Sequence, residues 1–333
     1  MKKLSIVLLI LVAVVGFAFA EGSKEAKVLK LSEVHVDGYP TTMADLEFAR
    51  LVEEKTQGRV KIEVYSNGTL YGEETGAIEA MQIGDCAFAR VSASPVANYV
   101  PALNAIQLPY LYVSADHMWK VLNSEVGQGM LDAVEASGSG LIGLCWYDSG
   151  SRNFYTTTSV KSPADLKGLK IRMQNNTMMC RLVELMGGTP VTGIGPNEIY
   201  GAITQGVIDG AENNWPTYYS KGDYEAAKFF CLDAHTRVPE ILLGSVAALK
   251  KAGITDKDIA IIKECAKKTQ EYEIAQWKAM EDTAEKAVRA NGNTIYTPSA
   301  AEMKQFQDAM APIYAEYGKG YEDIIAKIQA MGK

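Results

Sequence analysis

Residues 60–65 read Val-Lys-Ile-Glu-Val-Tyr, so apolar side chains alternate with charged ones. This period of two predicts a strand with one buried face. An apolar run at 28–34 predicts an earlier strand, and helical spacing over 41–56 predicts a helix between the two. Residues 73–83 and 87–91 then indicate a second helix and a third short strand. This alternation predicts a largely parallel sheet with helices on its faces.

A second set of α/β elements begins near Gly150. An apolar run at 141–147 leads out of the first set, and Ser162-Pro163 with Asp165 marks a helix start. The other elements predicted in this set are strands at 169–173 and 207–212 and helices at 178–186 and 196–205. A chain of 333 residues is too long for one ordinary core, and its length suits two lobes.

A single long helix is predicted near the C-terminus. Helical periodicity persists from Thr255, with Asp258 placed to complete its N-terminal cap, to the stop at Asn291 and Gly292. Its length is about 35 residues, or roughly 50 Å. Because this exceeds one lobe, we expect the helix to bridge both. Further amphipathic helices are expected over 299–331.

The lobes should be joined by several crossing segments, because no linker rich in proline, glycine or serine separates them. We expect lobe I to contain residues 21–149 and about 238–277, and lobe II residues 150–237 and about 278–333. The predicted fold class is α/β: two lobes with a cleft between them, mixed sheets flanked by helices, and one long bridging helix. This geometry suits a hinge that closes on a ligand.

The N-terminus has the pattern of a signal peptide. Lys2 and Lys3 are followed by an apolar stretch over 4–17 and by the small-x-small pattern of residues 18–20. About 14 apolar residues are too few for a bilayer span, which needs about 20. We therefore expect cleavage after Ala20 and export to the periplasm.

Composition excludes several classes of function. Cleavage would remove two lysines and leave 31 basic against 40 acidic residues, a net charge of −9. Such an acidic chain is a poor partner for nucleic acid. The three histidines are dispersed, and the five cysteines form no C-x-x-C pair. No nucleophile or nucleotide-binding motif occurs, so we expect neither an enzyme nor a metal or cofactor.

Two arginines occupy unusual places. Arg172 lies in the otherwise apolar strand at 169–173, and Arg152 lies at a strand end. A buried guanidinium needs a partner, and its planar fork matches a carboxylate in two parallel hydrogen bonds. The partner can be an acidic ligand or an internal aspartate or glutamate, and local sequence leaves both open.

Residues 205–216 read Gln-Gly-Val-Ile-Asp-Gly-Ala-Glu-Asn-Asn-Trp-Pro, which combines two amides with an indole. Amides can bind hydroxyls or a carboxylate, and an aromatic face suits the C–H side of a sugar ring. The alternative is a turn with a buried tryptophan.

With these motifs the chain resembles the periplasmic solute-binding proteins of TRAP (tripartite ATP-independent periplasmic) transporters, of the DctP or C4-dicarboxylate-binding type. The resemblance rests on residues 108–111, 168–172 and 196–213 and covers the mature chain. It implies a periplasmic binding protein that closes around a small organic acid and delivers it to integral membrane TRAP permease subunits. The ligand-binding residues that it implies are Arg172, Arg152 and Asn213.

The motifs at 212–216 and 235–240 look like those of family subgroups for hexuronates. A polyhydroxylated acid needs further hydrogen bonds, for which the candidates are Glu73, Arg90, His35, Asn214 and Trp215. Structural roles are the alternative; for example, Glu73 suits a helix start and Arg90 an internal pair. We expect a monomer. The alternative functions are a receptor for a C4-dicarboxylate, sialic acid or keto acid, and a secreted sugar-acid hydrolase or lyase.

Overall fold

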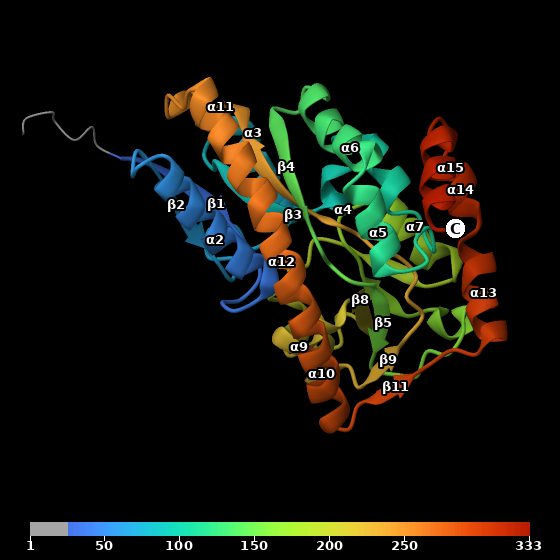
Figure 1. The fold of residues 1–333 in the computed structure, drawn as a ribbon. Coiled ribbons are helices and arrows are strands. Elements are labelled where there is room, and N and C mark those ends of the chain that lie inside the picture. Colours follow the sequence, from blue (N-terminus) through green and yellow to red (C-terminus); the bar gives the residue numbers. More distant parts are fainter. Residues whose placement is uncertain (1–25) are drawn as a thin grey trace, which may run out of the picture.

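The computed structural model describes residues 26–333, and Figure 1 shows their arrangement. The predicted signal peptide, residues 1–20, lies outside the described residues. Within them the chain forms a five-stranded sheet of order β2-β1-β3-β10-β4 and a six-stranded sheet of order β11-β9-β5-β8-β6-β7. We call the lobe built on the five-stranded sheet lobe I and the other lobe II. The predicted α/β class with two mixed sheets is confirmed.

The lobe I sheet contains the parallel unit predicted from the sequence. Its strands are β1 (Lys27–Ser32), β2 (Val60–Tyr65), β3 (Phe88–Ser92), β4 (Leu141–Tyr147) and β10 (Glu240–Ser245). Strand β1 pairs in parallel with both β2 and β3. Strand β10 lies antiparallel between β3 and β4, so a segment from late in the chain completes the sheet.

The lobe II sheet is made of short strands. They are β5 (Asn153–Thr156), β6 (Lys170–Arg172), β7 (Thr189–Val191), β8 (Gly210–Asn213), β9 (Phe229–Cys231) and β11 (Thr294–Tyr296). Strand β8 begins three residues later than predicted, because the backbone N–H groups of Val207 and Ile208 donate back to the Ala202 carbonyl oxygen in the preceding helix. Strand β6 lies in parallel between β7 and β8.

Helices cover both sheets. In lobe I they are α2 (Pro40–Lys55), α3 (Glu74–Ile83), α4 (Ala93–Val96), η1 (Pro101–Ile106), α5 (Ala115–Leu122), α6 (Glu125–Ala136) and α11 (Val246–Lys251). In lobe II they are η2 (Pro163–Leu166), α7 (Thr177–Leu185), α8 (Ile199–Thr204), α9 (Trp215–Ser220) and α10 (Asp223–Ala226). The helix start predicted at Ser162 is present with its capping box, but η2 is only one short 3-10 turn.

The long helix α12 spans Asp256–Ala290, 35 residues, and bridges the lobes as predicted (Figure 1). Thr255 and Asp258 form a reciprocal capping box at its start. The helix packs on α2 and β4 of lobe I and then on α9 of lobe II. The chain also crosses between the lobes after β4 and before β10. The lobes are therefore joined by several segments of the chain, which suits a hinge.

The C-terminal helices return toward lobe I. They are α13 (Ala300–Met310), α14 (Pro312–Tyr317) and α15 (Glu322–Met331). Helices α13 and α14 contact α7, whereas α15 contacts α5 and η1. The end of the chain thus ties the second lobe to the first.

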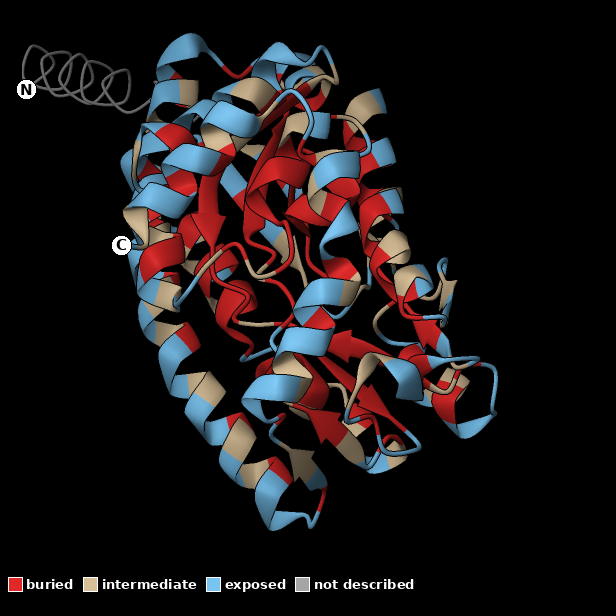
Figure 2. Cartoon of the chain, turned by 90° about the vertical axis from the view of Figure 1, so that its right-hand side faces the viewer, coloured by how far each residue is buried: buried red, intermediate tan, exposed pale blue. Residues whose placement is uncertain are grey.

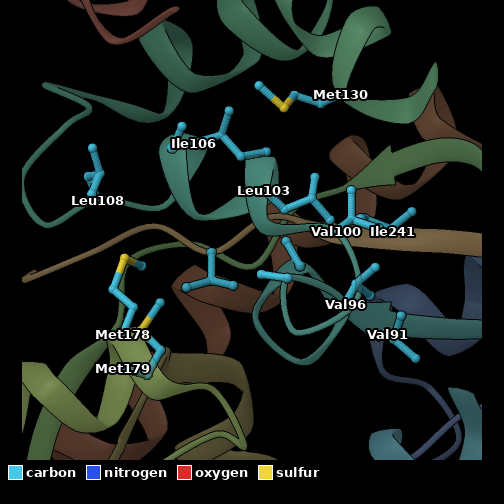
Figure 3. Packing of buried hydrophobic residues seen from close by; sticks show 14 of the residues in the cluster. Val91, Val96, Val100, Leu103, Ile106, Leu108, Met130, Met178, Met179 and Ile241 are labelled. Atoms are coloured by element: carbon cyan, nitrogen blue, oxygen red, sulfur yellow. The ribbon is translucent and has the colours of Figure 1, made fainter. Parts of the chain in front are cut away.

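Buried residues concentrate on the strands of both sheets and on the helix faces that cover them (Figure 2). One apolar cluster continues across both lobes. Figure 3 shows part of it, with Met178 and Met179 from lobe II below Leu103 and Ile106 from lobe I. All five cysteines are unpaired in the structure, and four of them are buried. None of the helices within residues 26–333 is long and apolar enough to cross a membrane.

Gly210 at the start of β8 gives a test of this packing. A Cβ on Gly210 would lie 2.2 Å from the carbonyl oxygen of Tyr155 on β5. We expect Gly210→Ala to lower the free energy of unfolding by about 1–3 kcal/mol, as overpacking does. Urea unfolding of the variant and of the natural chain measures this change in the free energy of unfolding.

Gly129 is the matched control. It lies inside α6, and a Cβ there would meet nothing within 4 Å. Gly129→Ala should therefore raise the free energy of unfolding by about 0.5–1 kcal/mol. Equal effects of the two substitutions would contradict the close approach at Gly210.

Candidate functional site

A polar cleft lies between the lobes, where the carboxyl ends of parallel strands from both sheets meet. Such ends are where ligands bind in open α/β sheets. Lobe I contributes Val34, His35, Glu73, Glu74, Thr75, Arg90, Ser92, Pro95 and Glu240; lobe II contributes Arg152, Arg172, Gln174, Asn175, Pro196, Asn213, Asn214 and Thr217. Seven of the eight residues predicted to bind a ligand line this cleft; Trp215 does not.

Arg172 is a buried guanidinium without a counterion. It is the last residue of β6 and is 6% exposed. Its Nε donates to the carbonyl oxygen of Ile194 at 2.9 Å, and no carboxylate within residues 26–333 lies within 4.0 Å of it. Burial lowers the pKa of Arg172, and the nearby charge of Arg152 lowers it further. An unpaired buried charge is costly, so the site is prepared for an anion.

Arg152, in contrast, already has an internal partner. Its Nη2 donates to Glu212 Oε1 at 2.8 Å and its Nε also contacts that carboxylate. His235 lies behind Glu212, with its Nε2 3.4 Å from Glu212 Oε2 and its Nδ1 2.7 Å from Asp233 Oδ2. These four side chains are buried and carry alternating charges.

The alternating charges shift the pKa values of this chain of residues. Burial alone would raise the pKa of Glu212, but Arg152 and His235 outweigh it and lower that pKa to about 2. Burial alone would lower the pKa of His235, but Asp233 and Glu212 outweigh it and raise that pKa to about 9. Arg152 is therefore held in place by a fixed network. Glu212, which neutralises Arg152, forms no ion pair with Arg172.

The two asparagines at the end of β8 differ in what they can offer a ligand. Asn213 Oδ1 accepts from Arg152 Nη1 at 3.2 Å and from the backbone N–H of Asn214 at 2.9 Å. Its amide group has no acceptor within the described residues and faces the cleft. The Asn214 side chain instead caps α9 through Thr217 and donates to the carbonyl oxygen of Ser149.

On the lobe I wall, Arg90 is surrounded by carboxylates. Its Nε donates to Glu33 Oε2 at 2.8 Å, and its Nη1 donates to Glu74 Oε1 at 2.6 Å and to Glu240 Oε2 at 2.5 Å. Arg90 is 1% exposed. The internal pair that was left open for Arg90 is therefore present, and three acids share one guanidinium.

His35 and Glu73 lie on the same wall. His35 Nδ1 is 2.9 Å from Glu33 Oε1, and the ring stacks on Tyr39. Burial, aided by Arg90, lowers the pKa of His35 to about 4, so the imidazole is neutral at physiological pH. Glu73 is the residue before α3 and is half-buried at the mouth of the cleft.

Trp215 has a structural position. Its indole stacks on Phe230 with 4.1 Å between the ring centroids, and the Arg289 guanidinium lies 5.8 Å from the indole ring. It belongs to the apolar cluster of lobe II. The expected contact between Trp215 and a ligand is therefore not supported by its position, because the first turn of α9 directs the side chain into the core.

Seven polar residues of the cleft were not among the candidates, and three of them bear on what the cleft can bind: Glu74, Glu240 and Gln174. Gln174 is 8% exposed and its Oε1 has no hydrogen-bond partner within the described residues. The sequence could have indicated Gln174, because residues two apart on an extended segment face the same side. Gln174 is therefore expected beside Arg172. Glu240 ends the motif at 235–240, but no local pattern reveals its distant partner.

The lobes are closed over the cleft. Several hydrogen bonds join the lobes around it, among them these four: Asn197 Nδ2 to the Asn67 carbonyl oxygen (2.8 Å), Lys221 Nζ to the Val34 carbonyl oxygen (2.7 Å), Asn98 Nδ2 to the Asn175 carbonyl oxygen (2.7 Å), and Tyr39 with Thr217 (2.9 Å between oxygens). We call these contacts the rim bonds. They shield the cleft from solvent, which strengthens electrostatic interactions inside it.

Comparison with known proteins gives consistent matches. The family model described as bacterial extracellular solute-binding protein, family 7, matches residues 31–320. A solute-binding protein of Chromohalobacter salexigens is 34% identical over 300 residues, which cover 89% of this chain and 87% of the relative.

Two solved structures are similar over most of their length. A TRAP periplasmic solute-binding protein from Pseudomonas putida F1 with bound D-glucuronate has a TM-score of 0.86 and 34% identity, covering 91% of this chain and 97% of that one. Another from Bradyrhizobium sp. BTAi1, in complex with α/β-D-galacturonate, has a TM-score of 0.86 and 34% identity, covering 91% and 99%.

The charge of His235 should make stability depend on pH. Because its folded pKa of about 9 lies above the ordinary value of 6.5, its contribution is complete below about pH 6.5 and is lost as the pH rises through 9. The difference in free energy of unfolding between the natural chain and His235→Gln should therefore shrink between pH 6.5 and 9.5. Denaturant unfolding at several pH values measures this.

Phe48→Leu is the control for that series. Phe48 packs edge-on against Phe88 in lobe I, so its substitution removes packing without touching His235. Its effect on the free energy of unfolding should stay constant over the same pH range. A constant difference for His235→Gln as well would contradict a charged His235.

Proposed function

The chain belongs to family 7 of the bacterial extracellular solute-binding proteins, the DctP-type binding proteins of TRAP transporters, and we propose that it captures a hexuronate between its two lobes. Members of this family bind solutes, so the chain is a binding protein and not an enzyme. The observation that carries the proposal is the buried guanidinium of Arg172, which has no counterion within the described residues.

A ligand carboxylate supplies the missing charge. The two Nη groups of Arg172 can hold it in parallel hydrogen bonds, which fixes the direction of the ligand as well as its charge. The amide group of Asn213 offers a further donor on the same wall. Arg152 adds positive potential while Glu212 holds its side chain in place.

Hydroxyl groups of the ligand meet the opposite wall. The lobe I wall provides hydrogen-bond acceptors from Glu73, Glu74 and Glu240, and Gln174 Oε1 of lobe II adds another. A polyhydroxylated acid satisfies acceptors that an apolar acid would leave unpaired, and unpaired buried polar groups reduce affinity. The hexuronates bound to the two similar solved structures are acids of this kind.

We further propose that the chain is exported after cleavage behind Ala20 and acts in the periplasm as a monomer. It would then deliver its acid to the integral membrane permease subunits of the transporter. Nucleic acid is not among the proposed partners, because the net charge is negative.

A thermal-shift screen tests the choice of ligand. A ligand that binds only the folded form raises the melting temperature. We expect D-glucuronate or D-galacturonate to raise it, with little change from succinate, sialic acid or a keto acid. The proposal would be contradicted if succinate, sialic acid or a keto acid raised the melting temperature and neither hexuronate did. Chemical consumption of the hexuronate by the protein would also contradict it.

Arg172→Met separates binding from stability. Without ligand the variant should melt at the same temperature as the natural chain or higher, because it removes an unpaired buried charge. Its affinity for the hexuronate should fall by about 2–5 kcal/mol, the usual effect of truncating one partner of a buried charge pair. Calorimetric titration and thermal melting measure the two quantities.

Arg50→Met is the matched control. Arg50 lies exposed on α2 and pairs with Glu47 and Glu54 on the same helix. It should change neither affinity nor melting temperature by much, since surface ion pairs contribute about 0–1 kcal/mol. Near-normal affinity in Arg172→Met would contradict the assignment of Arg172.

A further inference from the structure

We infer that the cleft accepts one carboxylate only, and that the acids around Arg90 exclude a ligand with a second carboxylate at its far end. We call Glu33, Glu74 and Glu240 the acid cluster. The inference rests on the proposed function, because it concerns which sugar acids the same cleft takes. It predicts that hexuronates bind and that the corresponding diacids are rejected.

The first step is the balance of charge on the lobe I wall. Arg90 is in hydrogen-bond contact with all three carboxylates of the acid cluster. One guanidinium cannot neutralise three acids, so this wall carries excess negative charge. Arg90 is 1% exposed and has no capacity left for a ligand carboxylate.

The second step concerns the other cations near the cleft. Arg152 is paired with Glu212. Lys221 does not line the cleft, because its Nζ donates to the Val34 carbonyl oxygen and to Asn197 at the rim. Among the residues lining the described cleft, Arg172 is thus the cation without a carboxylate partner, which provides for one ligand carboxylate.

The third step uses the hydrogen-bond direction beside the acid cluster. Ser92 Oγ lies 2.9 Å from Glu240 Oε1 and must donate to it, because an ionised carboxylate only accepts. Ser92 Oγ therefore accepts from Gln174 Nε2 at 2.8 Å. This fixes the orientation of the Gln174 amide and leaves its buried Oε1 as an acceptor without a partner.

A wall of acceptors discriminates between two kinds of ligand end. A hydroxyl can donate to Gln174 Oε1 or to Glu74 or Glu240, the two carboxylates of the acid cluster that line the cleft. A ligand carboxylate can only accept, so it would face these oxygens without a hydrogen bond and with like charge. In a closed, poorly solvated cleft such a mismatch is expensive.

The test compares D-glucuronate with D-glucarate, which has a second carboxylate in place of the carbonyl end. Calorimetric titration at pH 8 gives both dissociation constants. This pH is chosen because burial raises the pKa of Glu74 to about 7, so Glu74 is mostly ionised at pH 8. We expect D-glucarate to bind at least about tenfold more weakly than D-glucuronate.

Glu74→Gln and Glu240→Gln identify the cause of the discrimination. Each removes one negative charge with little change of shape, so each should narrow the ratio of the two dissociation constants by about tenfold. Glu79→Gln is the matched control, because Glu79 lies exposed on the same helix as Glu74 and should leave the ratio unchanged. Two acid-cluster variants are used in case one of them fails to fold.

The outcomes distinguish this inference from the proposed function. Equal affinity for the two ligands would overturn the inference while leaving a receptor for sugar acids. A large ratio that both acid-cluster variants leave unchanged would also overturn it, because shape would then be the cause. Failure to bind any hexuronate would overturn the proposed function and the inference with it.

Discussion

The lack of a counterion for Arg172 is the constraint on which the cleft depends. Strand β6 holds this guanidinium between β7 and β8, and the Ile194 carbonyl oxygen takes only its Nε. Glu212 of lobe II is already paired with Arg152, and no carboxylate within residues 26–333 forms an ion pair with Arg172. A fold that keeps such a charge away from water loses stability at this position and gains a site for an anion.

The two walls of the cleft have opposite electrostatic character. Lobe II presents a positive charge at the carboxyl ends of β6 and β8, whereas lobe I presents the acids around Arg90 near the ends of β1 and β3. A ligand bound between them is therefore oriented by the field as well as by shape. Helix α12 packs on α2 of lobe I and on α9 of lobe II, so it constrains how the two walls face each other in the closed state.

Local sequence patterns predicted the elements whose signals are contained in one segment. The strand at 60–65, the capped helix from Thr255 and the position of Arg172 on a strand are of this kind. The acid cluster could not be predicted in this way, because Glu240 is 150 residues from Arg90 in the sequence and reaches it only through the antiparallel pairing of β10. Local sequence left two interpretations open for Trp215, a ligand contact or a buried side chain, because its orientation depends on packing against the distant Phe230.

The rim bonds also have a kinetic consequence. The rim bonds must break before a bound molecule can leave, and three of the four involve backbone carbonyl groups that a change of cargo would not alter. Residence time is thereby set partly by the edges of the lobes and not only by the groups that recognise the cargo. A receptor built in this way can be retuned for a different acid in its interior while its release step, and whatever surface triggers that step, stays the same.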